Sequence, residues 1–243
     1  KGVIQMKFVI PKQHGAWAML LIPFLLGMLA GHPTIWHIPL LIGWLFLYLA
    51  TFPFIMYVRK KKRDLYGKWA LIYGAIATIS LIPILVVKLS MVFFGLVMIP
   101  LFLINIYFAK KNKERAFIND LVAILVFCIG GLASYYLGTG RLSQETWYIF
   151  SYSFLYFLGT TFYVKTMIRE KNNQTFKYFS WGFHLLLPFI ILGTNGGWAV
   201  IAYIPSILRA FISNKIKLSV MQIGIIEIIN SLFYFITMLI IIH

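Results

Sequence analysis

Apolar residues form long stretches along the whole chain, and short polar or basic segments separate them. A helix needs about 20 mainly apolar residues to cross a bilayer, and about nine stretches reach or approach that length. Because backbone groups in lipid must be hydrogen-bonded internally, we expect each stretch to be an α-helix. The predicted helices cover residues 16–31, 36–58, 69–87, 90–109, 118–138, 146–168, 178–193, 196–212 and 219–242. Residues 193–197, rich in glycine, predict a tight turn.

Lysine and arginine residues occur almost entirely in the N-terminal tail and in the connections after even-numbered helices. Only Lys88 and Arg141 fall in the other set of connections. Cytoplasmic segments of membrane proteins carry the excess of positive charge. The alternation therefore predicts a cytoplasmic N-terminus and a C-terminus outside. We expect an all-α polytopic membrane protein with about nine transmembrane helices, which form a single domain over residues 1–243.

The composition excludes the other broad classes of protein. Of the 243 residues, 61% are hydrophobic and 12% are charged, whereas a soluble domain is about 25% charged. Such high hydrophobicity also excludes disorder. The net charge of +16 follows the predicted topology, so we expect membrane lipids as partners and no nucleic acid. A single cysteine, Cys128, excludes a disulfide framework and a cysteine-based zinc site.

The cytoplasmic ends of the second, fourth and sixth predicted helices share a pattern. A tyrosine is followed by a basic residue six positions later and an acidic residue seven positions later, starting from Tyr57, Tyr107 and Tyr163. A partial copy pairs Tyr203 with Arg209. The repeat predicts hairpin pseudo-repeats around a cytoplasm-facing cavity. The alternative is that these residues are ordinary interfacial anchors, which are also tyrosine and basic residues.

These ends supply the candidate site residues. The acidic candidates for catalysis, or for orienting the bases, are Asp64, Asp120 and Glu170. The bases can hold a diphosphate or a carboxylate, with arginine giving bidentate contacts. The free N–H groups at the start of the fifth helix favour an anion as well. The predicted ligand-binding residues are His14, Arg59, Arg63, Lys110, Arg115, Asn119, Arg169 and Arg209.

Several polar residues fall inside predicted helices. Ionisable residues at such positions face the bundle interior and are candidates for function. Glu227 is either a functional group or half of a structural ion pair, for which Arg209 of the preceding helix is within reach. His184 is either catalytic or an ordinary hydrogen-bonded histidine. Asn105 and Asn230 are predicted to make hydrogen bonds between helices.

The segment 11–20, which contains His14-Gly15-Ala16-Trp17, and the stretch from Arg169 to His184 resemble the YwiC-like bacterial membrane proteins over essentially the whole chain. This resemblance implies a multi-pass protein of the bacterial cell membrane and no particular reaction. The chain is more distantly similar to the UbiA-type intramembrane prenyltransferases, in helix number, cytoplasmic N-terminus and polar loops after the second and sixth helices. That resemblance implies a UbiA-like helical bundle that binds a prenyl pyrophosphate or another amphipathic anion.

The UbiA-type family holds its substrate through Mg²⁺ ions bound by two Asp-rich motifs. Neither motif is present here. The two loops supply only Asp64 and Glu170 as acidic residues. Bases such as Arg59 and Lys165 occupy positions where the UbiA-type family has acidic residues. Since a pair of Mg²⁺ ions needs several carboxylates, the sequence leaves the cofactor unknown, and one Mg²⁺ ion bridged by substrate phosphate stays open.

Three functions remain in competition. The first is binding of an amphipathic anion from the cytoplasmic side, with or without prenyl transfer. The second is a transporter or flippase of a small anion or a lipid, which is supported by helix-interrupting prolines and by Glu227. Two observations argue against a transporter. The bases gather at one end of the predicted helices, and a transport path needs polar groups in the middle of the membrane, where the sequence suggests only Glu227. The third is a non-catalytic membrane partner or assembly factor.

Overall fold

A computed structural model describes residues 8–11, 14–194, 196–213, 216 and 218–242. The described residues form helices joined by short turns and contain no β-strand. The α-helices are α1 (His14–Ala30), α2 (His37–Val58), α3 (Arg63–Val87), α4 (Val92–Lys110), α5 (Phe117–Thr139), α6 (Gln144–Val164), α7 (Gln174–Leu192), α8 (Ile204–Ile212) and α9 (Val220–Ile242). The all-α fold and the nine helices of the prediction are therefore confirmed for this part of the chain.

Six of these helices are long and apolar enough to cross a membrane, namely α2, α3, α4 with the short turn before it, α5, α7 and α9. Helix α1 is shorter. The predicted eighth span is divided into a 3-10 helix, η3 (Gly197–Tyr203), and α8. Helix α6 has 21 residues but is not among the six. Its buried face carries the polar residues Tyr152, Ser153, Tyr156 and Thr160, which lower its hydropathy.

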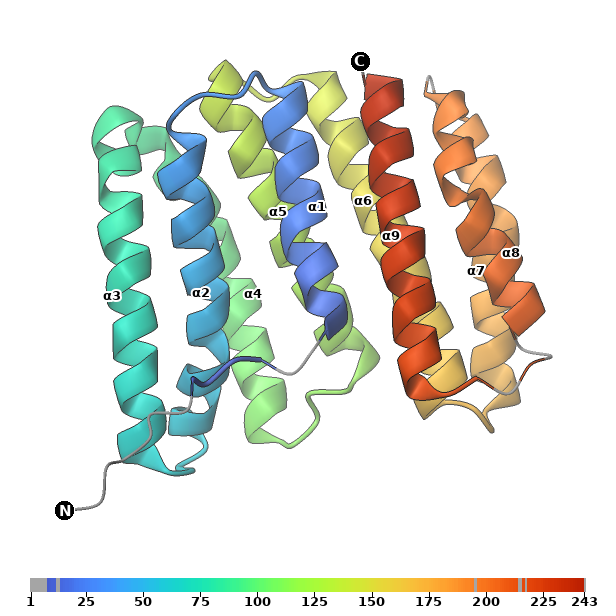
Figure 1. Ribbon diagram of the computed structural model, residues 1–243, viewed down its shortest axis with the longest axis horizontal. Coiled ribbons are helices and arrows are strands. Elements are labelled where there is room, and N and C mark those ends of the chain that lie inside the picture. The colour runs from blue at the N-terminus through green and yellow to red at the C-terminus, as the bar shows by residue number, and fades with distance from the viewer. Residues whose placement is uncertain (1–7, 12–13, 195, 214–215, 217, 243) are drawn as a thin grey trace.

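The helices stand side by side and alternate in direction (Figure 1). The turns after α2, α4 and α6, the end of α8 and the start of α9 lie at one end of the bundle, and the C-terminus lies at the other (Figure 1). We call the first of these the basic end, because Arg59, Lys111, Arg169 and their basic neighbours are in these turns. The basic segments that follow every second helix in the sequence therefore lie together at one end of the bundle.

Helices α1 and α5 touch through their backbones. An added Cβ atom at Gly131 of α5 would lie 2.6 Å from the carbonyl oxygen of Pro23 in α1. At Gly31, after α1, a Cβ would lie 2.7 Å from the carbonyl oxygen of Tyr135. Glycine is required here because small residues let helix backbones approach closely. Helices α1–α5 form the first half of the bundle, and Leu20, Phe24 and Trp44 belong to its apolar core.

The core of the second half, α6–α9, is rich in tyrosine and includes Tyr152, Tyr156, Tyr203 and Tyr234. Its helices are also less regular. Helix α6 continues as a π-helical turn, η2 (Lys165–Arg169), and η3 continues directly into α8, which has a proline in its first turn. Irregular turns of this kind often occur at functional sites.

Candidate functional site

At the basic end, Asp120 in the first turn of α5 binds two bases that follow α6. The Lys165 ammonium lies 2.6 Å from its carboxylate, and the Arg169 guanidinium lies 3.8 Å from the same oxygen. Lys165 also donates a hydrogen bond of 2.6 Å to the Arg115 carbonyl. We call Asp120, Lys165, Arg169 and Arg115 the Asp120 cluster. The π-helical turn places Lys165 inside the fold, where only 4% of its surface is exposed.

The Asp120 cluster holds more positive than negative charge. Lys165 engages the carboxylate closely, and the Arg169 side chain stays 37% exposed. The cluster lies beside the start of α5, where the N-cap residue is Ala116 and no side chain caps the helix. Uncapped N–H groups and an exposed guanidinium both favour an anion.

The turn between α4 and α5 also contacts a base at the end of α2. Arg59, at the end of α2, forms an ion pair with Glu114 and a hydrogen bond with Asn112. From the first turn of α5, the Asn119 amide donates a bond of 2.8 Å to the Glu114 carbonyl in this turn. Arg63 lies over the Tyr57 ring, 5.3 Å from its centroid. Residues of α2 and of the segment after α6 therefore meet the same turn.

The structure brings some of the predicted site residues together and separates others. Arg115, Asn119, Asp120 and Arg169 gather near the start of α5, with Arg59 on the far side of the turn. The remaining candidates lie elsewhere. Asp64 is exposed in the first turn of α3, Lys110 is exposed at the end of α4, and Arg209 is buried in α8. His14 begins α1, and its side chain lies outside the described structure.

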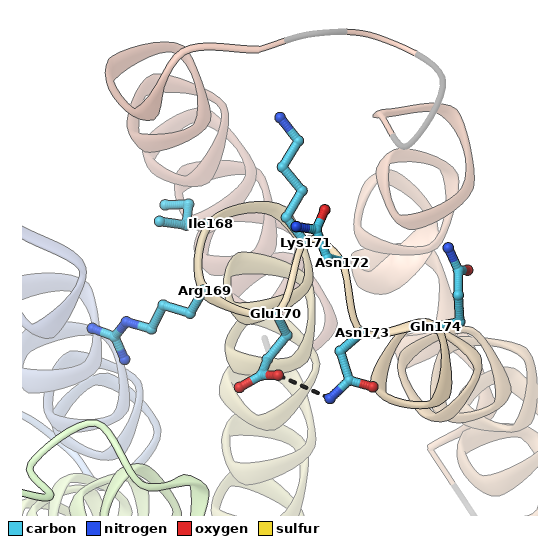
Figure 2. A pocket seen from close by; sticks show the side chains of 7 residues that line it. All are labelled: Ile168, Arg169, Glu170, Lys171, Asn172, Asn173 and Gln174. Atoms are coloured by element: carbon cyan, nitrogen blue, oxygen red, sulfur yellow. Dashed lines mark hydrogen bonds between the residues drawn. The ribbon is translucent and has the colours of Figure 1, made fainter.

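Glu170 belongs to an open depression that Ile168–Gln174 line. It accepts a hydrogen bond of 2.9 Å from the Asn173 amide (Figure 2). Figure 2 shows that Arg169 points away from Lys171 and Gln174. The side chains diverge from the loop, so this depression does not by itself form a convergent binding site.

The described residues contain no group of three or more His, Cys, Asp or Glu side chains that could hold a metal ion. A pair of Mg²⁺ ions requires several carboxylate ligands. At the basic end, Asp120 is engaged by Lys165, Glu114 by Arg59, and Glu170 by Asn173. The described residues therefore do not fit a two-metal site.

A second polar cluster lies within the helices of the second half. Arg209 of α8 forms an ion pair with Glu227 of α9, which is one of the two alternatives that the sequence leaves open for Glu227, and both residues are buried. The Arg209 guanidinium also donates a bond of 3.1 Å to the Thr160 hydroxyl of α6, and its carbon lies 4.4 Å from the centroid of the Tyr163 ring. Ser206 is a further neighbour at 3.5 Å.

Polar contacts continue deeper between the same helices. The Asn230 amide of α9 donates bonds of 2.6 Å to the Tyr156 hydroxyl and 2.9 Å to the Ser206 hydroxyl. The Tyr156 hydroxyl lies 3.3 Å from the Ser231 hydroxyl, and its ring stacks on Tyr234 with centroids 3.9 Å apart. The predicted interhelical role of Asn230 is confirmed. The same prediction for Asn105 is wrong, because this amide bonds to the Leu101 carbonyl of its own helix.

Near the end opposite the basic end, the Tyr203 hydroxyl donates a bond of 2.6 Å to the Tyr152 carbonyl. The Tyr152 hydroxyl is 2.6 Å from that of Thr194 in the turn after α7. These contacts and those around Arg209 all lie beside α6. We call this set of residues the polar seam, and it comprises Thr194, Tyr152, Tyr203, Tyr156, Asn230, Ser206, Thr160, Arg209 and Glu227.

His184 of α7 is fully buried beside the polar seam. Its Nδ1 is 2.7 Å from the Ser180 carbonyl. A carbonyl can only accept, so Nδ1 carries the hydrogen and Nε2 holds the free lone pair of the neutral ring. Nε2 has no hydrogen-bond partner within the described structure, and it faces α6, 3.4 Å from where a Cβ atom of Gly159 would stand.

Two of these features cannot be recognised from the pattern of residues along the sequence. Along the sequence Lys165 is one of several bases after the sixth helix, yet in the structure it is the closest basic partner of Asp120. The hydroxyl groups of the polar seam are not recognised from the sequence either, although Tyr152, Tyr156 and Thr160 recur at helical spacing in α6. Polar groups at mid-depth are therefore more numerous than Glu227 alone, which removes one argument against a path through the helices.

The tyrosine-base-acid pattern does not give equivalent contacts in its copies. Tyr57 is covered by Arg63 of its own copy, whereas Tyr163 is covered by Arg209 of another helix. Arg169 instead approaches Asp120. Which base reaches which partner is decided by neighbouring helices and not by spacing along one helix.

Comparisons with known proteins give the family of the chain. The model of the family described as "YwiC-like protein" matches residues 10–135. The "Uncharacterized protein YwiC" of Bacillus subtilis (strain 168) is 51% identical over 229 residues, which cover 94% of this chain and 96% of that protein. An "Uncharacterized protein" of Haemophilus influenzae is 40% identical over 235 residues, which cover 97% of this chain and 99% of that protein. No solved structure matches the chain.

Proposed function

We propose that this chain, which belongs to the YwiC-like protein family, is a multi-pass protein of the bacterial cell membrane that binds an amphipathic anion at its basic end. The six apolar helices support membrane insertion. The gathering of bases at one end supports an orientation with that end in the cytoplasm. The C-terminus, at the opposite end (Figure 1), is then outside.

The observation that carries the proposal is the geometry of the Asp120 cluster. Lys165 neutralises the Asp120 carboxylate at 2.6 Å. Arg169, 3.8 Å away and 37% exposed, keeps donors free on its guanidinium. The uncapped start of α5 adds backbone N–H groups at the same place. An anionic head group would be held there by charge-assisted hydrogen bonds.

The head group that suits this arrangement is a phosphate or a diphosphate on a membrane-embedded tail, as in a prenyl pyrophosphate. Arginine meets phosphate oxygens in a bidentate manner, and the apolar helices accommodate the tail. If the bound molecule were an allylic diphosphate, Arg169 would also stabilise the negative charge that develops on a departing diphosphate. The distant UbiA-type resemblance suggests the same class of ligand.

Binding is best measured with the purified full chain in lipid nanodiscs, with farnesyl diphosphate as the probe and with Mg²⁺ present or omitted. The variant Arg169→Gln should bind about tenfold or more weakly, because a hydrogen bond to a charged group is worth about 1.5–3 kcal/mol and about 1.4 kcal/mol is a tenfold change in Kd.

The matched control is Lys62→Gln, which removes the same charge from an exposed residue at the same end and should leave the Kd unchanged. Equal weakening in both variants would mean that the basic end attracts anions only by its overall charge. The absence of binding to the unsubstituted protein, with and without Mg²⁺, would contradict the proposal.

A further inference from the structure

Four phenylalanine rings of α5, α6 and α7 are in contact with one another near the basic end. The ring centroids of Phe117 in α5 and Phe162 in α6 are 5.0 Å apart. By the same measure, Phe176 of α7 lies 6.3 Å from Phe117 and 5.8 Å from Phe162. Phe162 is also 5.2 Å from Phe183, which is further along α7. We call these four residues the phenylalanine strip.

The strip begins beside the charged residues of the Asp120 cluster. Phe117 precedes Asp120 by three positions in α5. Phe162 precedes Lys165 by three positions at the end of α6. Residues three apart are neighbours on the surface of a helix, and Asp120 and Lys165 are themselves in contact at 2.6 Å. The same two helices therefore present a pair of rings next to a pair of charges.

From there the strip follows α7 away from the basic end. Phe183 is seven positions after Phe176, which is about 10 Å at a rise of about 1.5 Å per residue. An added Cβ atom at Gly159 of α6 would lie 3.1 Å from the Phe183 ring, so the glycine lets this ring lie against α6. All four rings of the strip are partly exposed, whereas Phe157 of α6 is only 1% exposed. The strip thus keeps aromatic surface open beside the helices.

We propose that the phenylalanine strip holds the tail of the anion whose head group binds the Asp120 cluster. The ligand is then a lipid of the bilayer leaflet at the basic end, and it enters from the side, over the exposed parts of these rings. This inference rests on the proposed function and adds the source of its ligand and the place of the tail.

Charge and polarity together argue for this occupant. The partly exposed Arg169 guanidinium and the uncapped start of α5 favour an anion. The strip that begins next to them offers only apolar ring surface. A molecule that joins an anionic head group to an apolar chain satisfies both parts, whereas a free phosphate ion would leave the strip without a ligand.

The rings act through contact geometry and not through the hydrophobic effect. Lipid tails are as apolar as the protein surface, so a tail gains nothing from leaving water when it moves from the bilayer to the strip. Aromatic side chains instead offer flat surfaces with preferred packing arrangements, and the gain is the sum of many small van der Waals contacts. Substitution of a ring by leucine keeps the site apolar and removes this geometry.

The test measures binding to the purified full chain in lipid nanodiscs with two probes, farnesyl diphosphate and inorganic diphosphate. Phe183→Leu should weaken the binding of farnesyl diphosphate about twofold to tenfold, the range expected for one lost aromatic contact. The Kd of inorganic diphosphate should stay unchanged, because the head-group site is intact. The matched control is Phe179→Leu in the same helix, whose 67% exposed side chain is not part of the strip. It should leave both Kd values unchanged.

A second measurement places the tail directly. A farnesyl diphosphate analogue that carries a diazirine at the far end of its tail is activated by light in the same nanodiscs, and the modified residues are identified by mass spectrometry. Modification should concentrate on α6 and α7 near Phe183, and excess unlabelled farnesyl diphosphate should suppress it.

Two outcomes would overturn the proposal. The first is equal binding of farnesyl diphosphate by Phe183→Leu, Phe179→Leu and the unsubstituted protein, when all three melt at the same temperature. The second is suppressible modification that is confined to helices other than α5, α6 and α7. If Arg169→Gln still weakens binding in either case, the head-group site stands and the tail lies elsewhere. If Arg169→Gln has no effect, the proposed function itself fails.

Discussion

Helices α1–α5 and helices α6–α9 both consist mainly of apolar residues, and they pack by different means. In the first group, α1 and α5 meet backbone to backbone at glycines such as Gly131. In the second group, hydroxyl, amide and charged side chains fill the space between helices, as at Asn230 and Arg209. The first group has little room for polar side chains at its closest contact. The second is built around them.

This difference shows that one chain can pack some helices backbone to backbone and others through polar side chains. Close contact between helix backbones depends on shape alone, and any added atom disturbs it. The second group depends on hydrogen bonds and an ion pair between side chains of different helices, so the loss of one partner leaves a buried polar group unsatisfied. The described residues of the second group also contain two irregular segments, η2 and η3. Those of the first group contain one, the short η1 (Leu89–Met91) before α4.

The largest effect should come from breaking the buried ion pair. Glu227→Leu leaves the Arg209 charge unpaired in an apolar interior and should lower the free energy of unfolding by about 3–5 kcal/mol. The double variant Arg209→Met/Glu227→Leu removes both charges and should recover most of that loss. Both are measured by thermal unfolding in detergent. A double variant less stable than Glu227→Leu would show that the unpaired Arg209 charge is not the main cause of the lost free energy of unfolding.

The next effect tests the first group of helices. Gly131→Ala places a Cβ atom 2.6 Å from the Pro23 carbonyl oxygen, which should cost about 1–3 kcal/mol through overpacking. Gly74→Ala in α3 is the matched control, since an added Cβ meets nothing within 4 Å there, and it should stabilise the helix by about 0.5–1 kcal/mol. Equal melting temperatures for the two variants would refute close packing at Gly131.

A smaller effect compares buried tyrosines in the two groups. Tyr203→Phe removes the hydroxyl that bonds to the Tyr152 carbonyl at 2.6 Å and should cost about 1 kcal/mol. Tyr48→Phe removes a buried hydroxyl for which the described part of the chain supplies no partner, so its melting temperature should stay level or rise. The reverse order of the two melting temperatures would contradict the distinction between the groups.

The smallest effect is expected at the surface of the basic end. Arg59→Gln breaks the ion pair with Glu114, whose side chain is 34% exposed. Partly exposed pairs contribute about 0–1 kcal/mol, so the melting temperature should hardly change. If Arg59→Gln were as damaging as Glu227→Leu, the turn between α4 and α5 would be a main support of the fold.

Much of the fold can be predicted because its signals are local. A stretch of apolar residues predicts a helix wherever it packs, since lipid and a protein core both exclude unpaired backbone groups. The break between α7 and η3 at Gly193 is also local. The division of the predicted eighth span at Tyr203 into a 3-10 and an α segment could not be predicted, because it depends on contacts with α6 and α9.

The candidate site could be predicted only in part. Asp120 and Arg169 were identified as charged residues near helix ends, and Glu227 with Arg209 as neighbours in consecutive helices. The role of Lys165 was not, since it depends on a contact between residues 45 positions apart in sequence. Tertiary contacts of this kind have no counterpart in the spacing of residues along one helix.

The number of helices, their approximate ends and the gathering of positive charge at one end of the bundle follow from the polarity of residues that are neighbours in the chain. Three features depend on how the helices pack together: the contact of α1 with α5 through glycines, the ion pair of Asp120 with Lys165, and the hydrogen bonds of the α6 hydroxyl groups with Asn230 and Arg209. Hydrogen bonds and close packing require particular distances between atoms in space, and residues far apart in the chain meet those distances only in the folded bundle.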